Sequence, residues 1–118
     1  MSYRSETETP FPASPVPATD KLVPITSWAD MHREAREMGV ELDLFWYDSV
    51  AEGVAYFFHW LPEPRCIVLV VWNGTEPTHV ESRKRGDVLA SDDENGSILG
   101  EVIQAFRFAG YWPELSNH

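Results

Sequence analysis

The sequence predicts one α+β domain, in which an antiparallel sheet of four strands is flanked in the chain by two helices, in the order α-β-β-β-β-α. The first observation is helical periodicity near both ends of the chain, over residues 25–39 and 97–110. The second is a set of strand-like stretches between them, at 40–48, 54–61, 66–72 and 75–83, with 88–90 as a short fifth candidate. Short turns separate these stretches, which favours antiparallel pairing of neighbours, and we expect both helices to pack on one face of the sheet.

The first 24 residues differ in composition from the rest of the chain. They hold five of the nine prolines, and proline fixes φ and removes a backbone donor. We therefore expect residues 1–24 to form a flexible tail and residues 25–118 to form the domain. Phe11 and Val16 are candidate anchors of the tail, either to the body of the protein or to a partner.

The net charge of −10 comes from 19 acidic and 9 basic residues. It argues against direct nucleic-acid binding, which depends on Lys and Arg at the phosphates. The acidity fits a solubilising surface, a halophilic or high-GC source, or a surface complementary to a basic partner. No apolar run approaches the roughly 20 residues that span a membrane, and the N-terminus does not resemble a signal peptide. The single cysteine, Cys66, fits a reducing compartment, so we expect a cytoplasmic protein with a buried thiol.

The first helix has a start, a buried stripe and an end. Ser27 is placed to cap it, Asp30 stands three residues later, and Gly39 is the left-handed stop. The predicted apolar stripe consists of Trp28, Met31, Ala35 and Met38. The predicted solvated face consists of Arg33, Glu34, Arg36 and Glu37.

The strands at 40–48 and 54–61 are expected to form a hairpin around SVAEG. The register that keeps the apolar residues together pairs Trp46 with Tyr56, Leu44 with Phe58 and Leu42 with Trp60. The stretch CIVLVVW is apolar on both faces, as in a central strand. Asn73-Gly74 is a hairpin signal, and Pro77 assigns the next strand to an edge.

With both helices on one face, the other face of the sheet is predicted to be open. In the preferred register it carries Phe45 opposite Phe57 and Asp43 opposite His59, with Tyr47 nearby. Exposed aromatic patches mark interaction sites, so this face is a candidate partner or homodimer interface, unless the tail or the C-terminal WPEL segment covers it. Base stacking on the aromatic residues is a third alternative, which Glu41 and Asp43 weaken.

The sequence contains few candidate residues for catalysis or metal binding. His59 and Asp43 form a candidate acid–base pair, but no serine or cysteine nucleophile is placed with them, so a cross-strand polar contact explains them better. The histidines and Cys66 show no metal-ligand spacing, so we expect neither a metal nor another cofactor. Asp92, Asp93 and Glu94 form an acidic loop before the second helix, where negative side chains are stabilised by the helix dipole. Arg83-Lys84-Arg85 is a basic cluster that is solvated or contacts a phosphate or an acidic partner.

These observations favour a small, acidic, non-enzymatic protein-binding module. Inhibitors, immunity proteins, antitoxins and nucleic-acid mimics of viruses or mobile elements have this profile, and the expected partner is a larger protein with a basic or apolar surface. The candidate contacts are Asp92, Asp93, Glu94, Asp43, Phe45, Tyr47, Phe57 and His59. The alternative is a small-ligand-binding or enzyme module, with His59 and Asp43 in a pocket between sheet and helices.

Overall fold

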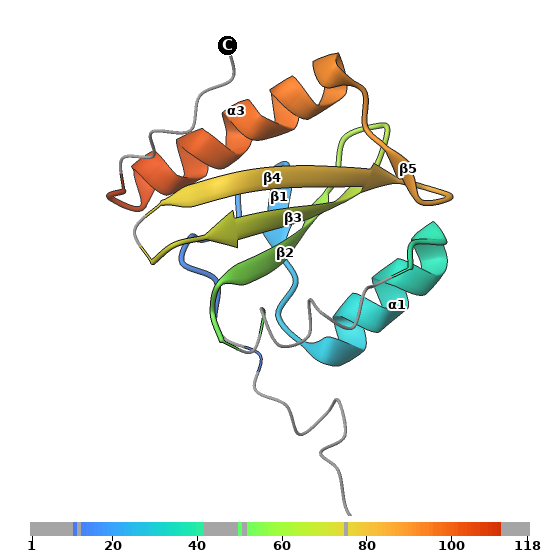
Figure 1. Cartoon of the computed structure of the whole chain (residues 1–118), viewed down its shortest axis with the longest axis horizontal. Helices are drawn as coiled ribbons and strands as arrows, with labels where there is room; N and C mark the ends of the chain where they lie inside the picture. Colours follow the sequence, from blue (N-terminus) through green and yellow to red (C-terminus); the bar gives the residue numbers. More distant parts are fainter. Residues whose placement is uncertain (1–10, 12, 42–49, 51, 75, 112–118) are drawn as a thin grey trace, which may run out of the picture.

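The computed structural model describes residues 11, 13–41, 50, 52–74 and 76–111. Within them a five-stranded antiparallel sheet runs in the order β1-β2-β3-β4-β5 (Figure 1). The elements are β1 (Leu22–Pro24), α1 (Trp28–Met38), β2 (Ala55–Trp60), β3 (Cys66–Trp72), β4 (Pro77–Lys84), β5 (Val88–Leu89) and α3 (Asp92–Phe108). The predicted α+β class, the antiparallel sheet and the short last strand are confirmed.

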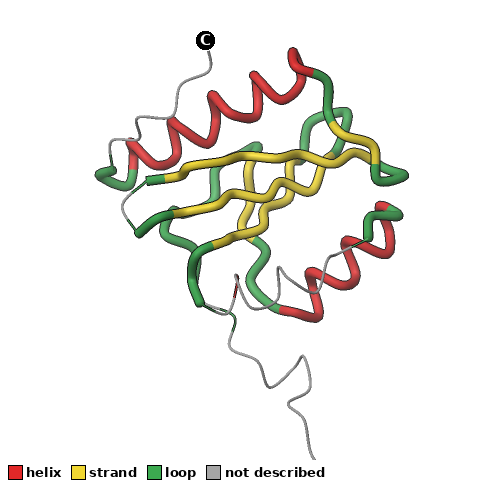
Figure 2. The backbone as a smooth tube through the Cα atoms, in the orientation of Figure 1, coloured by secondary structure: helices red, strands yellow, loops and turns green. Residues whose placement is uncertain are grey.

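The two helices lie on opposite faces of the sheet, so the prediction that both pack on one face is wrong (Figures 1 and 2). Side chains of a strand alternate between the faces, and β2 and β3 are apolar in both sets. Phe57 and Leu69 pack with α1 residues such as Met31. Phe58 and Val68 pack with α3 residues such as Phe106. An uncovered face would have left one of these apolar sets in water.

The segment assigned to the tail contributes to the fold, which corrects the boundary at residue 24. Leu22–Pro24 forms β1 at the edge of the sheet, and Val16 is buried in the core on the α3 side. Pro24 fits there because an edge strand tolerates a residue without an N–H. Phe11 lies edge-on to Trp28 with ring centroids 4.9 Å apart. Of the two alternatives for Phe11 and Val16, the structure shows contacts with the body of the protein, whereas residues 1–10 and 12 lie outside the described part.

The predicted strand at 40–48 lies mostly outside the described residues, which omit 42–49. The edge of β2 to which it was assigned carries β1 instead, with Leu22 paired to Trp60 and Pro24 paired to Phe58. β3 pairs along the other edge of β2, while Leu42 and Leu44, the predicted partners of Trp60 and Phe58, lie outside the described residues. A three-residue strand containing proline gave too weak a pattern to compete with the long alternation after Gly39.

The remaining strands follow the prediction. β3 lies in the middle of the sheet, and β4 pairs with it across the Asn73-Gly74 turn. β5 pairs only with Arg83 and Lys84, so β4 lies next to a very short edge strand. No helix in the described part of the chain is long and apolar enough to cross a membrane.

Both helix starts are capped, but α3 starts earlier than expected. In α1, Ser27 Oγ accepts a hydrogen bond from the Asp30 N–H (3.1 Å), and Gly39 ends the helix at φ 65°, as predicted. In α3, Ser91 is the N-cap, so the acidic run 92–94 forms the first helical turn and is not a loop. Glu94 closes a capping box with Ser91, which extends the helix by five residues relative to the predicted start at Ser97.

Candidate functional site

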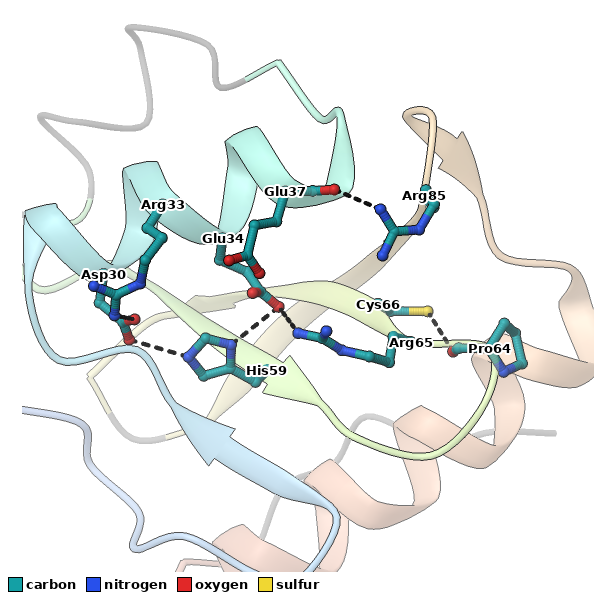
Figure 3. Close-up of polar contacts among 9 residues, drawn as sticks. All are labelled: Asp30, Arg33, Glu34, Glu37, His59, Pro64, Arg65, Cys66 and Arg85. Carbon is teal, nitrogen blue, oxygen red and sulfur yellow. Dashed lines mark hydrogen bonds and ion pairs between the residues drawn. The ribbon is translucent and has the colours of Figure 1, made fainter.

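A cluster of four charged or titratable side chains lies between α1 and the sheet (Figure 3). We call Asp30, Glu34, His59 and Arg65 the α1 charge cluster. The two ring nitrogens of His59 each face a carboxylate: Nε2 lies 3.0 Å from Asp30 Oδ2, and Nδ1 lies 3.1 Å from Glu34 Oε2. Arg65 Nη2 donates to the same Glu34 oxygen at 2.6 Å. The cluster therefore links α1 to β2 and to the residue that precedes β3.

Helical spacing explains the cluster. Asp30 and Glu34 are four residues apart and share one side of α1, while His59 projects toward α1 on the same face of the sheet as Phe57. Glu34 is only 5% exposed, so its assignment to the solvated face is wrong. It lies three residues after Met31 and four before Met38, the spacing of the buried stripe itself. That spacing indicates that Glu34 is buried, although a glutamate on a helix usually lies on the solvent-exposed face.

The contacts constrain the protonation of the cluster. A neutral imidazole carries one N–H, so both His59 contacts are hydrogen bonds to carboxylates only when both ring nitrogens are protonated. Burial alone would raise the pKa of Asp30. Hydrogen bonds and charge attraction from His59 and Arg33 outweigh it and hold that pKa below its ordinary value. The contacts with His59 and Arg33 therefore favour the ionised form of Asp30.

Phe57 and His59, two of the predicted partner contacts, lie under α1 and not on an exposed face of the sheet. Phe57 is 5% exposed and lies in the core under α1, and His59 faces the same helix, so neither lies on an open sheet face. The predicted partners of this face, Asp43, Phe45 and Tyr47, lie outside the described residues. The predicted contacts of Phe57 and His59 with Phe45 and Asp43 therefore fall outside the described part.

The predicted acidic contacts lie together in the first turn of α3. Asp92 and Asp93 are exposed, and their carboxylates have no hydrogen-bond or ion-pair partner among the described residues. Glu94 differs, because it accepts from the Ser91 N–H (2.8 Å) and pairs with Lys84 Nζ (3.0 Å). The pKa of Glu94 is lowered most by the hydrogen bond from the Ser91 N–H and next by the contact with Lys84.

A pocket of about 300 Å³ opens beside this turn. We call it the acidic pocket, because three of its lining residues, Glu63, Glu94 and Glu101, carry carboxylates. Its apolar lining comes from Trp60, Pro62, Pro64, Cys66 and Ile98, and it is completed by Lys21 and Ser97. Apolar walls with a carboxylate rim suit a Lys or Arg side chain, which has an apolar stem and a cationic head.

Reactive chemistry is not evident at these sites. Cys66 is fully buried, so the predicted buried thiol is confirmed, and desolvation raises the pKa of this thiol to about 11. The described residues hold no group of three His, Cys, Asp or Glu side chains arranged to bind a metal ion.

Comparison with protein-family models, with curated proteins and with solved structures gives no match to this chain. The function is therefore argued from the geometry of the chain itself.

Proposed function

We propose that this chain is a non-enzymatic protein-binding module of the inhibitor or immunity type, which binds a basic surface of a larger protein. The contact surface is the first turn of α3 together with the acidic pocket. The observation that carries the proposal is the pair of exposed carboxylates, Asp92 and Asp93, which have no partner among the described residues. Some acids of the chain are instead paired within it, as Glu34 is with Arg65 and His59.

The electrostatics support this choice of surface. A net charge of −10 attracts a basic partner over a distance of about 10 Å at 0.1 M salt. Asp92 and Asp93 need no rearrangement to bind, because α3 is already capped by Ser91 and fixed to the core through Ile98 and Phe106. A partner side chain that enters the acidic pocket would gain the attraction of its carboxylates and contact Trp60 at the same time.

The proposal is tested by titration with a blocked hexa-arginine peptide, followed by intrinsic tryptophan fluorescence. We expect saturable binding at about 0.05 M salt that weakens steeply toward about 0.5 M, because exposed charges are screened. The double variant Asp92→Asn/Asp93→Asn should bind about three- to ten-fold more weakly, since exposed charge pairs each contribute modestly.

The matched control is Glu37→Gln/Glu52→Gln, which removes the same charge from exposed positions outside the proposed surface. Equal weakening in both double variants would reduce the effect to net charge and overturn the site. Binding that is independent of salt would overturn the electrostatic mechanism.

The alternative function, a ligand or enzyme site around His59, stays a prediction. Neither the acidic pocket nor the second described hollow, at the β2–β3 turn, is lined by His59. The ring contacts Asp30 and Glu34 on α1, which accounts for its position by structure alone.

A further inference from the structure

We propose that a hollow at the other side of the β2–β3 turn binds a phosphate monoester. This cationic hollow has a volume of about 480 Å³ and is lined by Glu63, Pro64, Arg65, Lys84, Arg85 and Val88. It shares Glu63 and Pro64 with the acidic pocket, so the turn separates two hollows of opposite character. The inference is independent of the proposed partner surface on α3.

The charge of the cationic hollow runs against the charge of the chain. Three of the nine basic residues line it, in a protein with a net charge of −10. They are brought together by the antiparallel register, because Cys66 pairs with Lys84, which places Arg65 beside the end of β4. Glu63 is the acid that shares the lining.

The three cations are held in place by contacts that leave donors available. Arg65 is bound to Glu34 at 2.6 Å, and Lys84 is paired with Glu94 at 3.0 Å. Arg85 Nη1 donates to the main-chain oxygen of Glu37 at the end of α1, at 2.6 Å (Figure 3). A guanidinium has five N–H groups, so each arginine keeps donors for a second acceptor. Because a carbonyl has no net charge, this contact does not neutralise Arg85.

These features select the class of ligand. Guanidinium groups bind phosphate oxygens in pairs, and a lysine adds a point charge. Val88 is 53% exposed, and Pro64 also lines the hollow, so an apolar wall accompanies the cations. The volume exceeds the need of an inorganic phosphate and lies in the range of small-molecule sites. A phosphate that carries a small organic group fits both the charge and the wall.

The test is a titration of the full chain with phenyl phosphate, inorganic phosphate and benzoate at matched ionic strength, followed by backbone amide NMR. We expect saturable shifts at Arg85, Gly86 and Val88, with phenyl phosphate the tightest of the three. Arg85→Gln should weaken phenyl phosphate about tenfold or more, as the loss of a charge-assisted hydrogen bond does. Arg36→Gln removes the same charge from an exposed position on α1 and should leave the affinity unchanged.

A second variant adds a negative charge to the apolar wall of the cationic hollow and leaves the contacts of its three cations in place. Val88→Glu places a carboxylate at an exposed edge position and should abolish binding of phenyl phosphate, because like charges repel. Absence of saturable shifts in the unmodified chain would overturn the proposal. So would equal affinity for benzoate, or equal weakening by Arg36→Gln and Arg85→Gln.

Discussion

Among the described residues, α1 covers one face of the sheet and α3 covers the other, and the two faces hold different buried polar groups. Under α3 the buried polar residue is Ser82, a neutral side chain that donates to Asn95 Oδ1 at 2.9 Å. Under α1 it is Glu34, a carboxylate bound to Arg65 and His59. Besides apolar packing, α3 contacts the sheet through the Ser82–Asn95 hydrogen bond and a partly exposed ion pair between Lys84 and Glu94. On the other face, the ion network of α1 includes the buried Glu34.

The difference follows from how much apolar surface each helix brings. α3 has 17 residues and buries five apolar side chains. α1 has 11 residues and buries four apolar side chains together with Glu34. Burying a charge is costly unless it is paired, so Glu34 is stable there only with its partners Arg65 and His59. The comparison predicts that the α3 face is most sensitive to cavities and the α1 face to loss of charge.

The largest effect is expected from Phe106→Ala on the α3 face. Phe106 is 1% exposed and contacts the Trp72 ring at a centroid distance of 5.1 Å. A cavity of this kind lowers the free energy of unfolding by about 3–5 kcal/mol, measured by urea denaturation. Phe108→Ala, the same change at a 93% exposed position of the same helix, should change it by less than about 0.5 kcal/mol. Equal effects would contradict the assignment of the α3 face.

The second effect concerns the α1 face. Glu34→Gln keeps the shape but removes the charge that Arg65 and His59 share, and should lower the free energy of unfolding by about 1.5–3 kcal/mol. Glu37→Gln is the matched change at an exposed position of the same helix and should be close to neutral. A neutral result for Glu34→Gln would mean that the ion network does not stabilise α1.

Ser82→Ala should have a smaller effect. It removes the hydroxyl that donates to Asn95 and should cost about 0.5–1.5 kcal/mol in urea denaturation. Ser97→Ala, at an exposed position of α3, is its control. A loss larger than that of Glu34→Gln would reverse the comparison of the two faces.

The smallest effect is a dependence of stability on pH that arises from Asp30. Its pKa is lower in the folded chain than the ordinary value of 3.8. Its stabilising contribution is therefore complete above that value and is lost as the pH falls through the folded-state pKa. Solvent screens part of it, since Asp30 and Arg33 are partly exposed. Urea denaturation between about pH 6 and about pH 2 should show a shallower acid decline in Asp30→Asn than in the unmodified chain. Identical acid declines would contradict this role.

Local patterns were enough to predict most elements. Ser27, the apolar stripe and Gly39 defined α1, and the both-sided apolar run 66–72 defined the central strand. The capping box of Ser91 and Glu94 was present in the sequence too, but the acids around it suggested a loop. Signals within a few residues were therefore reliable where each residue type matched its usual role.

Features that depend on distant segments were not predictable. The pairing of β1 with β2 joins residues 22 and 60, and no local pattern indicates that contact. The choice of face for each helix depends on the direction of the connections, which the sequence does not express. The α1 charge cluster joins residues 30, 34, 59 and 65 and required the helix to lie over His59. An acid that stabilises the fold and an acid free for a partner look alike in sequence.

The most direct test of these two roles, an acid that stabilises the fold and an acid that binds a partner, is to measure the affinity of two variants for the hexa-arginine peptide. At a temperature where it remains folded, Glu34→Gln should bind the peptide as tightly as the unmodified chain does. Asp92→Asn/Asp93→Asn should keep the free energy of unfolding within about 0.5 kcal/mol and bind more weakly. Equal affinities of the two variants, or a larger loss for Glu34→Gln, would contradict the assignment of the α3 acids to recognition and of Glu34 to the fold.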